Sequence, residues 1–175
     1  MTRTAEDPVE TARCQWAERH PDESGFVVLV SMLRTYALLL RELERQLKPL
    51  GLNLSRCEVL LLLSFTKGQR LPVMRLRDLL LVHGSSATYL VDRLAAAGWV
   101  AREADPRDRR VSMVVLTDAG RDVLDQGIEV LVAGGFGPIG EMDEEGRREL
   151  SRLLAELRGV PIPRVGGLRG AEASR

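Results

Sequence analysis

The chain has 175 residues, 45% of them hydrophobic and 4% aromatic, so it has room for one ordinary domain with a hydrophobic core. Its 25 basic and 25 acidic side chains cancel, yet residues 70–110 carry eight arginines against five acidic residues, so this balance does not exclude a polyanionic partner. Two cysteines, Cys14 and Cys57, are too few for a disulfide scaffold and lack metal-ligand spacing, so we expect no metal site and no cofactor.

Both ends of the chain have the composition of unstructured segments. The N-terminal stretch MTRTAEDPVE is polar and acidic, which excludes a signal peptide, and residues 1–12 are expected to be disordered. The tail, residues 159–175, is rich in Pro, Gly and Arg and is expected to be disordered as well. Residues 13–158 then form the domain. No apolar run reaches the roughly 20 clean residues of a membrane span, so we expect a cytoplasmic protein without membrane contact.

The longest predicted helix runs from Gly25 to about Leu47. Apolar residues recur there at alternating spacings of four and three, which is typical of one continuous helix face. Further apolar residues widen this face beyond what one neighbouring helix would cover. Its central members are Leu29, Leu33, Tyr36 and Leu40.

Two more helices are expected before the middle of the chain. Ser55 followed by Glu58 reads as a capping box that starts a helix through Thr66, and the helix should be central because it is apolar nearly all round. Cys57 in this helix is expected to be a buried, inert thiol. A short helix over 71–82 follows, with three leucines turned inward: Leu76, Leu79 and Leu80.

Residues 85–97 predict an amphipathic helix with one clean apolar face. The opposite face carries Ser85, Ser86, Thr88, Tyr89, Asp92 and Arg93. Small hydroxyl groups at a helix N-terminus suit phosphates and base edges, and Arg93 could reach a phosphate or a guanine. The alternative interpretation is an ordinary solvated helix face.

A hairpin is expected next, with strands over 99–103 and 111–116 joined by a loop at 105–110. The loop carries three arginines: Arg107, Arg109 and Arg110. An arginine at such a tip can enter a narrow minor groove, where the negative potential is deepest. The other interpretation is an internal knot of ion pairs that shapes the hairpin, and both can hold, because an oriented arginine needs a carboxylate partner. Arg75 and Arg77, on the preceding helix, are either phosphate contacts or simple surface charge.

The last part of the chain is again helical. Thr117 or Asp118 should cap a helix to about Val132, the segment GGFGPIG at 134–140 breaks it, and a final helix spans 143–157. Four leucines lie on one side of that helix: Leu150, Leu153, Leu154 and Leu157. The predicted fold is therefore mainly α with a small β-hairpin wing. A winged helix-turn-helix over about 53–117 is flanked by helices over about 25–48 and 118–158.

Three motifs resemble one known family. VDRLAAAGWV at 91–100, DPRDRR at 105–110 and LTDAG at 116–120 are similar to the recognition helix and wing of the MarR (multiple antibiotic resistance regulator) family. The resemblance implies a homodimeric transcription factor, usually a repressor, whose terminal helices interlock and whose DNA is released by a small aromatic or phenolic ligand. It assigns the minor-groove contact to Arg109, with Asp105 or Asp108 orienting the guanidinium. The chain departs from the pattern at Pro72 and Trp99.

We therefore expect a regulator that binds double-stranded DNA as a homodimer, without enzymatic activity. A two-fold dimer would place its recognition helices in successive major grooves, about 10 base pairs apart, on a pseudo-palindromic operator. The competing class is a winged-helix interaction or dimerisation module without sequence-specific DNA binding. An enzyme is disfavoured because the sequence offers no nucleophile–base pair, phosphate-cradling loop or paired carboxylates.

Overall fold

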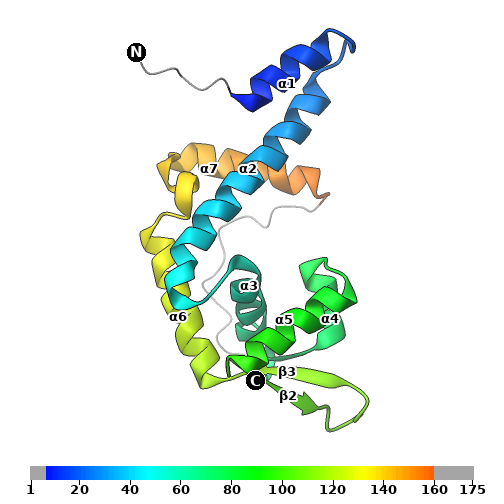
Figure 1. The fold of residues 1–175 in the computed structure, drawn as a ribbon, viewed down its shortest axis with the longest axis vertical. Helices are drawn as coiled ribbons and strands as arrows, with labels where there is room; N and C mark the ends of the chain where they lie inside the picture. The colour runs from blue at the N-terminus through cyan, green and yellow to red at the C-terminus, as the bar shows by residue number, and fades with distance from the viewer. Residues whose placement is uncertain (1–6, 160–175) are drawn as a thin grey trace, which may run out of the picture. The chain divides into compact units, whose positions relative to one another are not determined.

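The computed structural model describes residues 7–159 (Figure 1). They fall into two compact units, which are divided between Gly137 and Pro138. The first unit contains α1 (Pro8–Ala17), α2 (Ser24–Leu47), α3 (Leu54–Ser64), β1 (Arg70–Pro72), α4 (Val73–Leu80), α5 (Gly84–Ala96), β2 (Val100–Ala104), β3 (Ser112–Leu116) and α6 (Asp118–Ala133). The second contains α7 (Glu144–Leu157). This mainly helical fold with a winged helix-turn-helix is the one that the sequence predicts. In the described part of the chain, no helix combines the length and apolar character needed to cross a membrane.

Helix α1 corrects the prediction of disorder for residues 8–12, while residues 1–6 and the tail from residue 160 lie outside the described residues. Asp7 caps α1 by accepting the Val9 N–H at 3.0 Å, and Pro8 takes the first helical position, where no N–H is needed. The Trp16 ring stacks on Phe26 of α2, with 4.2 Å between ring centroids. The polar, acidic composition of residues 1–12 predicted disorder, but the capping side chain of Asp7 and the proline at position 8 start a helix there.

The first turn of α3 also differs from its prediction. Asn53, not Ser55, is the N-cap: its side chain accepts the Arg56 N–H at 2.9 Å, and the helix begins at Leu54. Asparagine and serine are about equally good caps, so the residue whose backbone is already extended takes the role. The long helix α2 agrees with its prediction and ends at a 3-10 turn over Lys48–Leu50, followed by Gly51 with φ 68°.

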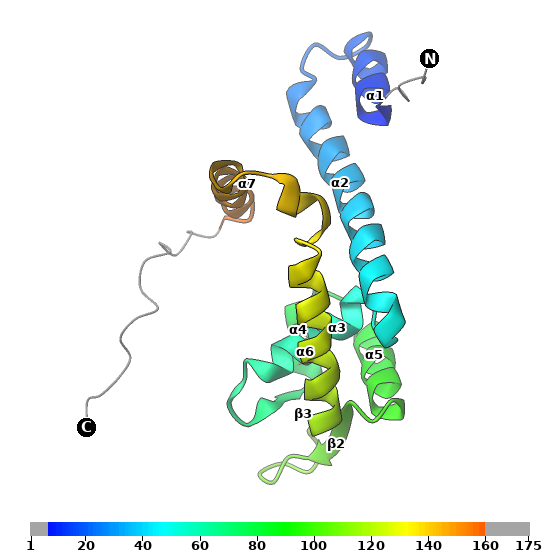
Figure 2. The same ribbon diagram turned by 90° about the vertical axis from the view of Figure 1, so that its left-hand side faces the viewer.

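The core of the first unit joins leucines from five helices, and all six of the following are fully buried: Leu47, Leu60, Leu63, Leu76, Leu94 and Leu124. Cys57 is buried in the same cluster, as predicted, and burial raises the pKa of its thiol. Trp99 packs against the cluster from its edge. Figure 2 shows α6 running beside α3 and the lower half of α2, which leaves the upper half of α2 beyond this core.

The wing is part of a three-stranded antiparallel sheet with the order β1-β3-β2. Strand β1 was not predicted; Leu71 pairs with Val114 where a helix was expected. The helix α4 starts at Val73 because Pro72 holds an extended backbone and disfavours a helical residue before it. In α4, Leu76 is fully buried as predicted, but Leu79 is 41% exposed, because a residue three positions on lies about 60° round the helix, at the border of the buried face.

The second unit is built around α7. Asp143 caps this helix by accepting the Gly146 N–H at 2.7 Å. Three of the four leucines predicted for its apolar side, Leu150, Leu153 and Leu157, are exposed, and Leu154 is partly buried. An apolar row of this length usually packs against another surface.

Candidate nucleic-acid interface

Helix α5 presents the two faces that its sequence predicts. Ala87, Val91 and Leu94 are buried in the core. The residues predicted on the opposite face are all exposed: Ser85, Ser86, Thr88, Tyr89, Asp92 and Arg93. The buried face fixes the helix on the domain, so the exposed face is a rigid surface of hydroxyl groups and charges.

The N-terminus of α5 is open toward this surface. His83 is the N-cap, but its side chain makes no capping hydrogen bond, and its backbone carbonyl accepts the N–H groups of Ser86 and Ala87. The N–H groups of Gly84 and Ser85 come before these first bonds of the helix, so they have no carbonyl partner within it. Unpaired amides and the helix dipole together favour a negatively charged group at such an end.

The C-terminus of α5 sets the direction of the chain into the wing. Gly98 has φ 76° and its N–H donates to the Ala95 carbonyl, while the Trp99 N–H donates to the Leu94 carbonyl. This pair of bonds is a Schellman motif, which needs a left-handed residue and therefore favours glycine. Strand β2 begins two residues later, at Val100, and Val100 is buried.

Arg93 is held by a neighbour one turn earlier on the same face. Its Nε–H donates to the Tyr89 hydroxyl at 3.1 Å, and its guanidinium carbon lies 5.2 Å from the centre of the Tyr89 ring. The bond uses one of five guanidinium donors, so the two terminal nitrogens remain to contact a partner. The pair orients an arginine outward without neutralising it.

The loop of the wing is held by its own aspartates. Asp105 accepts the backbone N–H of Arg107 at 2.8 Å, and Asp108 accepts that of Arg110 at 3.0 Å. These contacts differ from the predicted one, in which an aspartate orients the Arg109 guanidinium. A short aspartate side chain reaches the backbone two residues on more easily than it reaches a long neighbour.

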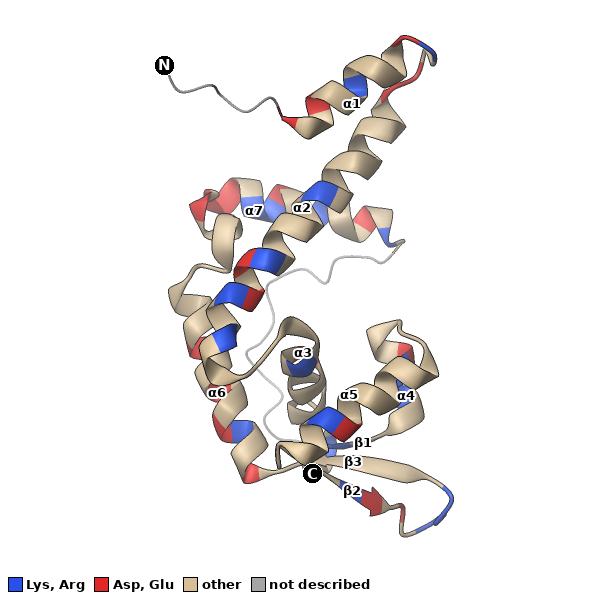
Figure 3. Ribbon diagram, in the orientation of Figure 1, with Lys and Arg blue, Asp and Glu red and all other residues tan. Residues whose placement is uncertain are grey.

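The wing arginines are consequently free. Arg107, Arg109 and Arg110 are exposed, and within residues 7–159 none of them forms an ion pair. Figure 3 shows the resulting basic tip of the wing. The alternative of an internal ion-pair knot does not describe this loop, because hydrogen bonds to its backbone shape the turn.

A residue that the sequence analysis did not single out joins the wing to α5. Arg102, on β2, lies 2.6 Å from Asp92 of α5, and its other terminal nitrogen donates to the Ser112 hydroxyl at 3.4 Å. The two charged residues are ten positions apart, so their contact depends on how the hairpin folds back. The only sequence signal is the alternation of the strand, which puts Arg102 on the same face as Val100.

The arginines predicted on the preceding helix differ in their surroundings. Arg75 is exposed, whereas Arg77 lies 2.6 Å from its neighbour Asp78, a contact between adjacent residues at the surface. Arg77 also lies beside the start of α5. A Cβ atom on Gly84, the first residue of α5, would be 3.7 Å from the Cδ atom of Arg77. The structure therefore brings Arg77, more than Arg75, to the open N-terminus of α5.

The apolar face of α2 is largely uncovered in the single chain. Leu33 is 63% exposed, and Leu29 and Tyr36 are similarly exposed, while Leu40 is partly buried nearer the core. Large apolar side chains that gather on one exposed face are typical of a surface that binds another protein.

Comparisons with known proteins agree with this geometry. A protein-family model described as "MarR family" matches residues 50–111. The solved structure of Sco5413, a MarR family transcriptional regulator from Streptomyces coelicolor, is 35% identical, covers 77% of this chain and 93% of Sco5413, and has a TM-score of 0.72. This chain belongs to the MarR family.

Two further relatives extend the match. The HTH-type transcriptional regulator MhqR from Bacillus subtilis is 30% identical over 102 residues, which are 58% of this chain and 69% of MhqR. Sco3205, a MarR family transcriptional regulator from Streptomyces coelicolor solved in complex with DNA, is 26% identical, covers 81% of this chain and 91% of Sco3205, and has a TM-score of 0.68. All three relatives are transcriptional regulators.

Proposed function

We propose that the protein is a homodimeric repressor that binds a pseudo-palindromic DNA operator. Residues 13–158 would form the regulator domain, with DNA-binding elements over about 53–117 and dimerisation helices over about 25–48 and 118–158. The observation that carries the proposal is the arrangement of α5 and the wing: an exposed polar helix face with an open N-terminus lies beside a hairpin whose tip arginines form no ion pair with any residue that the structure describes.

Each group has a role in this proposal. The N-terminal hydroxyls, Ser85, Ser86 and Thr88, would contact phosphates and base edges in the major groove, and Arg93 a guanine or a phosphate. Arg109 would enter the neighbouring minor groove, with Arg107 and Arg110 on the flanking phosphates. Asp105 and Asp108 would orient the wing through the backbone of its loop. Arg77, and more weakly Arg75, would add phosphate contacts.

Dimerisation would use apolar faces of which the single chain leaves most residues exposed. On α2 these are Leu29, Leu33, Tyr36 and the partly buried Leu40, and on α7 Leu150, Leu153, Leu157 and the partly buried Leu154. A two-fold dimer would place two copies of α5 about one helical turn of DNA apart, so the operator should have two half-sites about 10 base pairs apart.

Regulation by a small molecule is the part of the proposal that rests on family membership. A small aromatic or phenolic ligand would relieve repression if it prefers a spacing of the two DNA-binding lobes that does not fit the operator. Thermal unfolding in the presence of a panel of aromatic acids and phenols tests this directly, because a ligand that binds the folded state raises the melting temperature.

The DNA-binding proposal is tested by selecting duplexes from a randomised library with the full-length protein and measuring their affinity at several salt concentrations. We expect a two-fold symmetric sequence and an affinity that falls steeply with salt, with a logarithmic slope of about −0.9 per phosphate contact. A winged-helix module that binds only proteins would enrich no sequence and show no such slope. That result would refute the proposal.

A further inference from the structure

The ion pair between Asp92 and Arg102 joins the two elements that the proposed function brings to DNA; we call it the helix–wing bridge. The Arg102 guanidinium lies 2.6 Å from Asp92 of α5 and 3.4 Å from the Ser112 hydroxyl of β3. One side chain of β2 thus contacts both α5 and β3. Among residues 7–159, no other side-chain hydrogen bond or ion pair connects α5 with these two strands.

The bridge lies where the apolar contact between hairpin and core ends. Arg102 pairs with Val114, and Val100, two residues earlier on the same strand face, pairs with Leu116. Val100, Val114 and Leu116 are buried, so the inner face of the hairpin is apolar up to the bridge. Strand β2 ends two residues after Arg102, at Ala104, and the loop with the free arginines follows.

The bridge also removes a charge that would oppose DNA. Asp92 is exposed on the same face of α5 as Thr88 and Tyr89, where an isolated carboxylate would repel a phosphate. Arg102 neutralises this carboxylate. Because the two side chains are 60% and 34% exposed, the pair contributes little to the stability of the fold. The effect of the pair on DNA binding therefore comes from the position in which it holds the hairpin relative to α5, and not from its contribution to stability.

We infer that Asp92 and Arg102 are positioning residues that fix the wing at the angle at which Arg109 reaches the minor groove while α5 lies in the major groove. The inference rests on the proposed DNA binding. The two arginines of the wing then have different roles. Arg109 contacts the duplex, whereas Arg102 affects binding only by positioning Arg109.

The test compares the wild type with the double variant Asp92→Asn/Arg102→Gln, which removes the bridge and leaves the net charge unchanged. The probe is a duplex that the full-length wild type recovers from a randomised library. We expect binding to weaken about tenfold, the loss typical of one groove contact that is no longer well placed. In the Arg109→Ala background the same two substitutions should cause no further loss, because the contact they position is already absent.

Two controls keep the outcome clear. Melting temperatures should be unchanged, and stoichiometric titration with the duplex gives the active fraction of each variant, so partial unfolding does not enter the affinities. Arg102→Lys keeps a charge within reach of Asp92 and should restore part of the affinity. The inference is overturned if the neutral variant binds like the wild type, or if it loses the same factor with and without Arg109. If the wild type recovers no duplex, the proposed function fails first and this inference with it.

Discussion

A Cβ atom on Gly120 would lie 1.9 Å from the carbonyl oxygen of Trp99. The same oxygen accepts the backbone N–H of Thr117 at 3.1 Å, and the Thr117 hydroxyl donates to the Gly98 carbonyl at 2.7 Å while it caps α6. The first turn of α6 therefore lies directly on the backbone that leads into the wing. This contact gives a physical reason for the threonine and the glycine of the LTDAG motif.

Replacing Gly120 by alanine should destabilise the protein, although alanine favours a helix interior. The gain in helix propensity is about 1 kcal/mol at most, whereas a methyl group forced against a backbone oxygen must displace backbone and costs more than the usual 1–3 kcal/mol of overpacking. We expect a net loss of at least about 2 kcal/mol, or a fall of at least roughly 5 °C in melting temperature for a chain of this size. Thermal unfolding by circular dichroism measures it.

The matched control is Gly25→Ala in the first turn of α2. A Cβ at Gly25 has no neighbour within 4 Å, so this variant should melt at or slightly above the wild-type temperature. Equal melting temperatures for the Gly120→Ala variant and the wild type would show that the contact between α6 and Trp99 is not as close as described.

Charge reversal at Arg109 should weaken operator binding tenfold or more. The side chain is exposed at the tip of the wing and forms no ion pair among residues 7–159, so the substitution should leave the fold intact. It exchanges a minor-groove contact for a repulsion. Gel-shift titration of Arg109→Glu measures the loss. Arg19→Glu, the same change of charge in the turn after α1, should bind nearly as well as the wild type, and equal affinity of both variants would contradict the role of Arg109.

The bond between Tyr89 and Arg93 makes a prediction about specificity. With its Nε–H held by the tyrosine, Arg93 presents two terminal nitrogens in a fixed orientation, which suits bidentate contact with a guanine. Tyr89→Phe should therefore reduce the preference for guanine at one position in each half-site, and Arg93→Lys should abolish it, because an ammonium group has no planar fork. Selections from a randomised duplex library compare the variants. Identical preferences in all three proteins would exclude base recognition by Arg93.

Much of this interface follows from local sequence pattern. The two faces of α5 depend on the spacing of Ala87, Val91 and Leu94, and the loop at Asp105–Arg110 depends on charged and turn-forming residues within six positions. Such signals are complete within one element, so the helix, the wing and their exposed arginines could be predicted without a structure.

The parts that could not be predicted depend on distant contacts or on competing local ones. Strand β1 has three residues, and its partner Val114 lies more than forty positions from Leu71. The contact between Asp92 and Arg102 requires the angle between hairpin and helix, which no spacing encodes. Asp108 had two possible partners nearby, a backbone N–H and a guanidinium, and the sequence does not decide between them.

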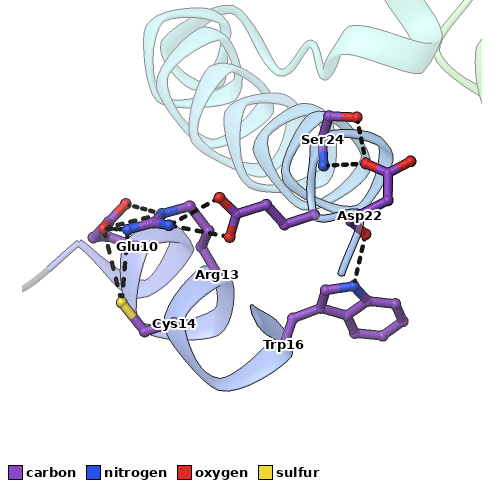
Figure 4. A network of polar contacts seen from close by, with 7 residues as sticks. Glu10, Arg13, Cys14, Trp16, Asp22 and Ser24 are labelled. Atoms are coloured by element: carbon purple, nitrogen blue, oxygen red, sulfur yellow. Dashed lines mark hydrogen bonds and ion pairs between the residues drawn. The ribbon is translucent and has the colours of Figure 1, made fainter. Parts of the chain in front are cut away.

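The two cysteines should differ in reactivity. Cys57 is buried in α3 and burial raises its thiol pKa, so little thiolate forms near neutral pH, whereas Cys14 is exposed on α1 (Figure 4). Maleimide labelling of the folded protein should modify Cys14 within minutes and Cys57 only after denaturation. Mass spectrometry of the wild type and of Cys14→Ser gives the result. Rapid labelling of folded Cys14→Ser would show that α3 opens readily.

The exposed face of α2 gives a prediction about assembly. Leu33 lies at the centre of that face, so Leu33→Glu would bury a charge in the proposed dimer interface, at a cost of several kcal/mol. We expect this variant to sediment as a monomer and to lose cooperative binding to a two-site operator. Leu38→Glu is the matched control, because Leu38 is also exposed but lies off the apolar stripe of the same helix. Analytical ultracentrifugation distinguishes the two. A dimeric Leu33→Glu protein would mean that α2 does not form the interface, and the operator geometry proposed above would lose its basis.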